Sequence, residues 1–350
     1  MLQKIRTALR FAVFIAVFLL LLSYVTGFFI RESMDTDETN AFYFEPENSI
    51  DVLYVGSSPI VRGVSPMLIY EQHGFAGYMR ATVLQAPAVT YALLAEALET
   101  QTPSLVVLRC DNILQTYEYD EREADLRRVL DGMRPSLHKL KVVLEVTKSD
   151  ERQSALSYFF PLLRYHDRWK TFVFGETEQI IRPTHSVRKG HLFLNESKPQ
   201  AYPEHFMQPL QTGANPNPYD ENAVMHFTNA IKLCTDNNIP VLVVHFPSMH
   251  WSLKRSEAMA AFAAECGADY LDMDLDVYRE AIGLNPETDY YDGGHVNTAG
   301  SLKVSAFLGD YMDVHYNLPD RRNDPAYALW DEDLLAYKDI LEGKTEGKTD

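Results

Sequence analysis

Two short segments, far apart in the chain, carry residue types that together could perform acyl transfer. Asp292 precedes His295 by three residues, and the two glycines between them allow a turn tight enough to bring the carboxylate onto the imidazole. Ser58 follows an apolar run and precedes Pro59, which is typical of a turn between a strand and a helix. The spacing therefore predicts Ser58 as a nucleophile, His295 as its general base and Asp292 as the group that orients the histidine, as in an esterase or acyltransferase.

Each of these patterns also has a simpler explanation. A Gly-Ser-Ser turn can serve helix capping alone, and an Asp-x-x-His pair can arise in a loop by chance or as half of a metal site. No further set of ligands adjoins Asp292 at metal-binding spacing, so the sequence predicts no metal and no other cofactor. Cys110, Cys234 and Cys266 form neither a disulfide framework nor a zinc pattern and are expected to be buried small hydrophobes.

The elements that would position these residues follow from three short apolar runs. Residues 51–55, 105–108 and 241–244 are apolar almost throughout, which is typical of strands buried on both faces of a parallel sheet. A further strand is expected at 270–273, and helical patterns occupy residues 65–73, 90–100, 222–236, 256–266 and 299–313. This alternation predicts an α/β fold, a three-layer doubly wound parallel sheet, with Ser58 at the carboxyl edge where such folds place their sites.

The middle of the chain, about residues 117–219, breaks this alternation and is predicted to be a helical and irregular insertion into one α/β domain of residues 49–317. Its mixture of aromatic, Arg and His side chains, including His166 and Trp169, could line a saccharide groove. Ordinary packing of helices over the sheet is the simpler explanation. Residues 318–350 are expected to form a short helix and a polar tail.

The N-terminal segment predicts a membrane anchor. Residues 11–30 carry no charge and are long enough to cross the hydrocarbon core as a helix. Basic residues precede this run and acidic residues follow it, so we expect residues 1–30 to be a cytoplasmic stub and anchor, with the rest outside. A cleavable signal peptide is the alternative, although no small-x-small cleavage site follows. The polar residues 31–48 are predicted to be a tether.

The composition of the chain excludes some classes of partner. The 350 residues carry a net charge of −17, which argues against a nucleic-acid ligand because phosphate binding needs a basic surface. The hydrophobic fraction of 46% and the charged fraction of 23% are those of an ordinary globular protein.

The sequence around the two chemical segments resembles the first and last signature blocks of the SGNH/GDSL hydrolase superfamily. The blocks read DVLYVGSSPIVRGVSP and YYDGGHVNTAGSLKVSAFL. The resemblance implies Ser58 as the nucleophile, with Ser57 in place of the family's usual Asp, and Asp292 and His295 as the remaining catalytic residues. The chain is similar in particular to membrane-anchored acyltransferases of the cell envelope, such as those that modify teichoic acids and alginate.

The resemblance also implies an oxyanion hole made by the serine N–H, a glycine N–H and an asparagine side chain. Asn112 lies where the asparagine is expected, after the second apolar run, although the family's Gly-x-Asn-Asp pattern is not reproduced. Residues 79–87 lack the expected glycine, and Gly77 is the nearest one. This departure is compatible with a non-hydrolytic or degenerate site. His245 and His250 could reach the edge of the site, but packing in the core or at the rim is the simpler explanation.

These patterns predict a single-pass protein of the cell membrane with an extracytoplasmic domain. We expect that domain to act through an acyl-serine intermediate on an envelope glycan or a similar polymer, and a membrane protein that donates the acyl group would be a natural partner. The alternative is a catalytically silent binding or assembly module of an envelope polymer-modification complex. The sequence leaves open whether water or a sugar hydroxyl accepts the acyl group.

Overall fold

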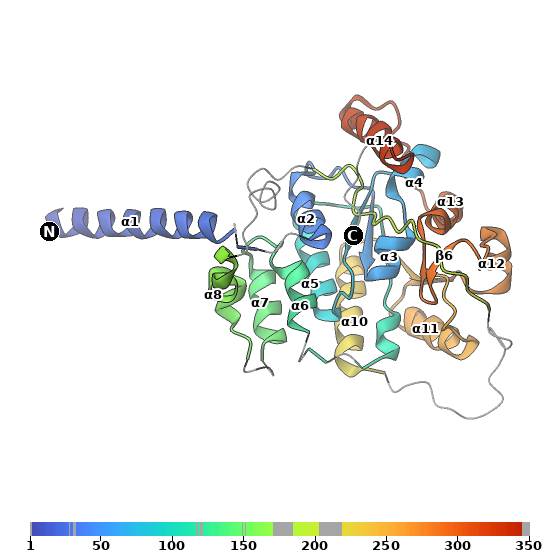
Figure 1. Cartoon of the computed structure of the whole chain (residues 1–350), viewed down its shortest axis with the longest axis horizontal. Coiled ribbons are helices and arrows are strands. Elements are labelled where there is room, and N and C mark those ends of the chain that lie inside the picture. Colours follow the sequence, from blue (N-terminus) through green and yellow to red (C-terminus); the bar gives the residue numbers. More distant parts are fainter. Residues whose placement is uncertain are drawn as a thin grey trace.

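The computed structural model describes residues 2–27, 29–30, 33–116, 118–119, 122–148, 150, 152–170, 185–202 and 219–344. Within them the fold is mixed α/β, built on a five-stranded parallel sheet of strand order β2-β1-β3-β4-β5 (Figure 1). The strands are β1 (Val52–Gly56), β2 (Gly77–Ala81), β3 (Leu105–Leu108), β4 (Val241–His245) and β5 (Asp269–Asp272). This order is a doubly wound one, and the predicted fold class is confirmed.

The strand order places a topological switch point between β1 and β3. After β1 the chain adds β2 on one side and then returns to pair β3 with the other side of β1. The register aligns Val55 of β1 with Leu108 of β3, so these two strands end side by side. Crevices at such carboxyl ends are where open α/β sheets bind ligands.

Both faces of the sheet are buried, which explains the continuous apolar runs. On β1, Leu53 and Val55 point into one core and Val52 and Tyr54 into the other. The helices packed in the first core are α5 (Pro87–Ala97), α10 (Glu221–Asp236) and α11 (Leu253–Glu265). Those packed in the second core include α3 (Ser58–Gly63), α4 (Pro66–His73), α12 (Asp276–Ile282) and α13 (Thr298–His315).

A small hairpin lies apart from the main sheet. Its strands, β6 (Tyr290–Asp292) and β7 (His295–Val296), are antiparallel, with Asp292 paired to His295 across the turn. The sequence patterns did not predict this hairpin or strand β2. Strand β2 escaped notice because its segment, GYMRA, contains a buried arginine, Arg80, whose charge is met by Glu96 at 2.9 Å.

The N-terminal helix α1 (Leu2–Gly27) is long and apolar enough to cross a membrane, as a signal sequence near an N-terminus also can be. The predicted tether is wrong over residues 34–44, which form α2 (Met34–Ala41) and the short helix η1 (Phe42–Phe44). They pack on the domain because Phe42 enters the core and the Thr36 hydroxyl donates to the Arg128 carbonyl at 2.9 Å. Residues 31 and 32 of that stretch lie outside the described residues.

The middle of the chain contributes short helices, the first of which pack on α5. They are α6 (Glu123–Leu130), α7 (Leu137–Val146), η3 (Ala155–Tyr158), α8 (Leu162–Tyr165) and η4 (His166–Lys170). A separate apolar cluster joins α5 to α6 and α7. Residues 171–184 and 203–218 of the predicted insertion, and 345–350 of the predicted polar tail, lie outside the described residues.

The C-terminal part adds η6 (Pro325–Tyr327) and α14 (Ala328–Leu341), which pack against α4. The cysteine prediction is confirmed in part: Cys110 and Cys234 are buried, but Cys266 is only half-buried.

Candidate active site

Ser58 is the first residue of α3 and lies directly beyond the carboxyl end of β1. The turn needs Gly56, which adopts φ +155°, and a Cβ there would lie 3.0 Å from the Arg109 Cβ. Pro59 follows at a position where a helix has no use for a backbone N–H. The sequence therefore presents the Ser58 side chain at the switch point of the sheet.

Asp292 and His295 reach Ser58 from the β6–β7 hairpin. The His295 Nε2 atom lies 2.8 Å from the Ser58 Oγ atom, and the His295 Nδ1 atom lies 2.8 Å from the Asp292 Oδ1 atom. The Gly294 N–H donates to the same Asp292 oxygen at 2.8 Å, which fixes the carboxylate within its own turn. The three residues thus form one continuous hydrogen-bonded row, with the two segments 237 positions apart in the chain.

The electrostatic surroundings favour a neutral His295 beside an ionised Asp292. Burial lowers the pKa of His295 below its ordinary value of 6.5, and the Asp292 carboxylate offsets this only in part. Burial alone would raise the pKa of Asp292, but the hydrogen bond from the Gly294 N–H and the interaction with His295 outweigh it and hold that pKa below 3.8. An imidazole that is neutral near pH 7 can accept the proton of a neighbouring hydroxyl.

A cavity of about 290 Å³ opens on this row, and Ser58, His295 and Asn112 all line it. Asn112 lies in the 3₁₀ turn η2 (Asp111–Leu114) that follows β3. Three arginines, Arg109, Arg122 and Arg255, line the same cavity, although the whole chain is strongly acidic.

The Arg109 guanidinium fixes the loop beyond β3. Its Nη1 atom donates to the Asn112 Oδ1 atom at 2.9 Å and to the Ser57 hydroxyl, and its Nη2 atom lies 2.6 Å from the Asp111 carboxylate. Because the Asn112 Oδ1 atom accepts from Arg109, the amide NH₂ of Asn112 points away from Arg109. That NH₂ group can act only as a hydrogen-bond donor. Sequence reasoning missed Arg109, although its position directly after the apolar run 105–108 could have marked it.

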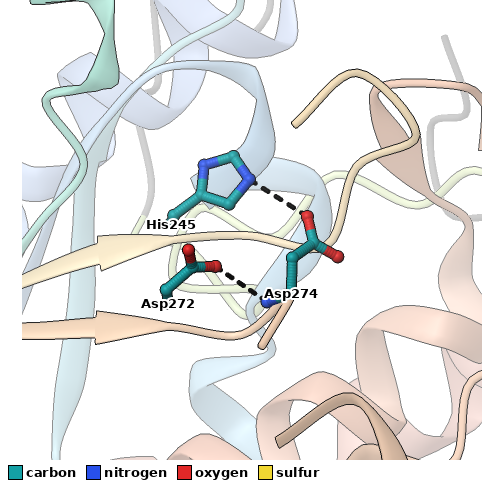
Figure 2. Close-up of side chains that lie close together, drawn as sticks. All are labelled: His245, Asp272 and Asp274. Atoms are coloured by element: carbon teal, nitrogen blue, oxygen red, sulfur yellow. Dashed lines mark hydrogen bonds and ion pairs between the residues drawn. The ribbon is translucent and has the colours of Figure 1, made fainter. Parts of the chain in front are cut away.

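His245, the last residue of β4, lines the cavity and is held by two carboxylates, one of which, Asp274, is seen beside it in Figure 2. Its Nδ1 atom lies 3.1 Å from the Asp111 carboxylate and its Nε2 atom 3.2 Å from the Asp274 carboxylate, while the Trp251 ring stacks on it at 3.5 Å. Burial lowers the pKa of His245, but these two carboxylates outweigh burial and raise that pKa to about 9. The two carboxylates thus favour the protonated form of the imidazole, while burial raises the pKa of Asp274 itself.

The His245, Asp272 and Asp274 group is the one set among the described residues with the proximity a metal ion needs. Most of its oxygen atoms are already used, since Asp272 accepts from the Trp251 indole at 2.8 Å and from the Asp274 N–H at 2.9 Å, and the second oxygen of Asp274 has no hydrogen-bond partner. A histidine binds a metal ion through the lone pair of a neutral ring nitrogen. Both ring nitrogens of His245 are engaged with carboxylates, so His245 has no lone pair to offer a metal ion. The group fits a buried ion-pair network and not a metal centre.

Of the other residues considered from the sequence, one lines the cavity and three do not. Gly77 pairs with Val52 at the opposite end of β1 from Ser58 and does not reach the site. His250 lines the cavity and abuts the hairpin, because a Cβ on Gly293 would lie 2.6 Å from its Nε2 atom. His166 and Trp169 lie on η4, which takes no part in lining this cavity.

One residue that sequence reasoning did not consider occupies the region where the glycine was sought. Leu84 lines the cavity and adopts a left-handed backbone with φ +57°, a conformation that favours glycine. The loop after β2 therefore has a backbone conformation typical of glycine, although no glycine is present. A search of the sequence for glycine could not find this position.

Comparison with known proteins adds little to this geometry. No family model matches the chain, and no curated protein matches its sequence. A solved structure from Bacteroides fragilis, provisionally described as an acylhydrolase, aligns over 77% of this chain and 90% of its own with a TM-score of 0.33 and 9% identity. At that level of similarity the alignment carries no argument about function.

Proposed function

We propose that this protein is a serine esterase or O-acyltransferase of the SGNH type. The observation that carries the proposal is the unbroken row of two 2.8 Å hydrogen bonds from Asp292 through His295 to Ser58, opening on a cavity. A serine, a base and an orienting carboxylate in hydrogen-bond reach are the signature of covalent acyl transfer.

The chemistry follows from the roles of the three side chains. The Ser58 hydroxyl attacks the acyl carbon of an ester while His295 Nε2 takes its proton, and Asp292 stabilises the resulting imidazolium. His295 then gives that proton to the departing alkoxide, which leaves as an alcohol, and an acyl-Ser58 ester remains. Water or a sugar hydroxyl reverses the sequence and frees Ser58, so hydrolysis and transfer share every protein group.

The developing oxyanion needs donors, and we assign two. The Ser58 N–H lies in the first turn of α3, where backbone donors have no partner within a helix. The Asn112 amide is the second, with Arg109 as the residue that positions it through Oδ1. Leu84, whose left-handed turn borders the cavity, occupies the part of the loop where a third donor would be expected.

We further propose that α1 anchors the protein in the cell membrane with its domain on the outer side. The uncharged run of residues 11–30 and the basic residues before it support this topology. Outside the cell membrane, acyl esters of envelope glycans or similar polymers are the substrates that an anchored domain can reach.

A serine-directed fluorophosphonate probe tests the proposal. We expect the probe to label the wild type and not the Ser58→Ala variant. Ser57→Ala is the matched control and should still be labelled. A folded wild type that resists the probe would instead favour a catalytically silent module that binds the polymer. Acyl-ester content of purified envelope polymers, with and without Ser58, would then identify the substrate.

A further inference from the structure

One part of the surface exposes large apolar side chains that the fold does not use. On α7, Leu137, Leu140 and Leu144 recur at helical spacing on one face, while Val142 and Val143 on the other side of the helix are buried against α5. Leu156 of η3, Leu163 of α8 and Trp169 of η4 continue the exposure, and all six side chains are 41–73% exposed. We call these six residues the leucine face.

The leucine face lies where the chain emerges from α1. Figure 1 shows α7 and α8, in green, at the edge of the domain beside the C-terminal end of α1. The Arg168 Nη1 atom of η4 donates to the Phe29 carbonyl, two residues beyond α1, at 3.0 Å. A membrane crossed by α1 would therefore meet this edge of the domain before any other.

The charge of this segment also differs from that of the protein. Residues 137–170 contain seven Lys and Arg against four Asp and Glu, a net +3 in a chain of net −17. Trp169 is followed by Lys170, and tryptophan and basic side chains are the residues that settle at the headgroup level of a bilayer. Exposed leucine and tryptophan side chains among basic residues are typical of a protein surface that lies in a lipid interface.

We propose that the leucine face rests in the outer headgroup region of the bilayer that α1 crosses. This inference relies on the membrane anchor of the proposed function but on none of its catalytic residues. Its consequence is a fixed orientation of the domain. Helix α3, which carries Ser58, is well separated from α7 and α8 in Figure 1, so the cavity would be held away from the lipid and open to a polymer in the envelope.

The test uses the full chain in vesicles of phosphatidylcholine and phosphatidylglycerol. A bimane fluorophore is attached at Leu144→Cys or Leu163→Cys in a Cys266→Ser background, where the two remaining cysteines are buried. The matched control is Leu335→Cys on α14, a helical leucine that is 67% exposed but distant from α1 in Figure 1. Lipids brominated near the headgroup quench a fluorophore only when it lies in the interface.

Quenching at positions 144 and 163 should exceed that at 335 at least about twofold, since an interfacial helix face is buried about 5–10 Å into the boundary region. Equal quenching at all three positions, or none at 144 and 163, would overturn the proposal and leave a protein partner as the occupant of the face. Failure of the vesicles to retain the protein on flotation would overturn it as well. Fluorophosphonate labelling of Ser58 in the same samples reports separately on the proposed catalysis.

Discussion

Replacing Arg109 by glutamine is expected to slow acyl transfer although Arg109 touches no reacting atom. The guanidinium fixes the Asn112 amide by donating to Oδ1 at 2.9 Å, and it also holds Ser57 and Asp111. A glutamine is too short and has too few donors to hold all three. Without that hold, the Asn112 NH₂ is free to turn away from the oxyanion.

The magnitude follows from the bond that is lost. A hydrogen bond to a charged group contributes about 1.5–3 kcal/mol, and about 1.4 kcal/mol changes an equilibrium tenfold, so the productive orientation should lose about 10–100-fold in population. The ceiling is the loss of the donor itself, about 10²–10³ in kcat for Asn112→Ala. The Arg109→Gln variant should therefore lower kcat with little change in KM.

A double-mutant cycle makes the reasoning refutable. If Arg109 acts through Asn112, then Arg109→Gln should have no further effect on kcat in the Asn112→Ala background. Arg255→Gln is the matched control, because Arg255 lines the same cavity but donates to the His250 carbonyl at 3.2 Å. Hydrolysis of a chromogenic acetyl ester measures all four variants, and thermal unfolding checks that each is folded. Multiplicative losses in the double variant would refute the positioning role.

The remaining predictions concern protons and metals. Activity should fall as pH drops through the pKa of His295, with the midpoint of kcat/KM below 6.5 because burial lowers that pKa; a midpoint above 6.5 would contradict the assignment. Asp292→Asn should lower kcat about 10³–10⁴-fold and move this midpoint to still lower pH, because the carboxylate favours the protonated imidazole; an unchanged profile would remove Asp292 from the triad. His245, with a folded pKa of about 9, stabilises the fold fully below its unfolded pKa of about 6.5, and this stability is lost as pH rises toward 9. The melting temperature of the wild type should therefore fall over that range relative to His245→Gln, and parallel curves would contradict the cationic imidazole. Chelators, Zn²⁺ and Mn²⁺ should leave both the melting temperature and the activity unchanged, whereas a rise with either ion would revive the metal interpretation of His245, Asp272 and Asp274.

The fold could be predicted from the sequence wherever burial imposed a uniform pattern. Strands β1, β3 and β4 are covered on both faces, so each reads as a continuous apolar run. Strand β2 is equally buried but accommodates Arg80 through an ion pair with Glu96, a solution that no local pattern records. The tether was mistaken for the same reason, since the contacts that hold α2 and η1 come from residues far along the chain.

The row from Asp292 to Ser58 could be predicted because two of its members are neighbours in the sequence and the third follows a recognisable strand. The role of His245 could not, since its two carboxylate partners follow other strands, and the role of Arg109 depends on a turn that folds Asn112 back onto it. Arg109 and Asp111 follow β3, His245 ends β4 and Asp274 follows β5, so parallel pairing alone brings them to one edge of the sheet. A charge buried at the carboxyl end of a strand costs free energy unless a counter-charge lies close to it, and the neighbouring strand ends are near enough to supply one. The alternation of charge from Asp274 to His245 to Asp111 to Arg109 meets that requirement, and it ends on the amide that we assign to the oxyanion.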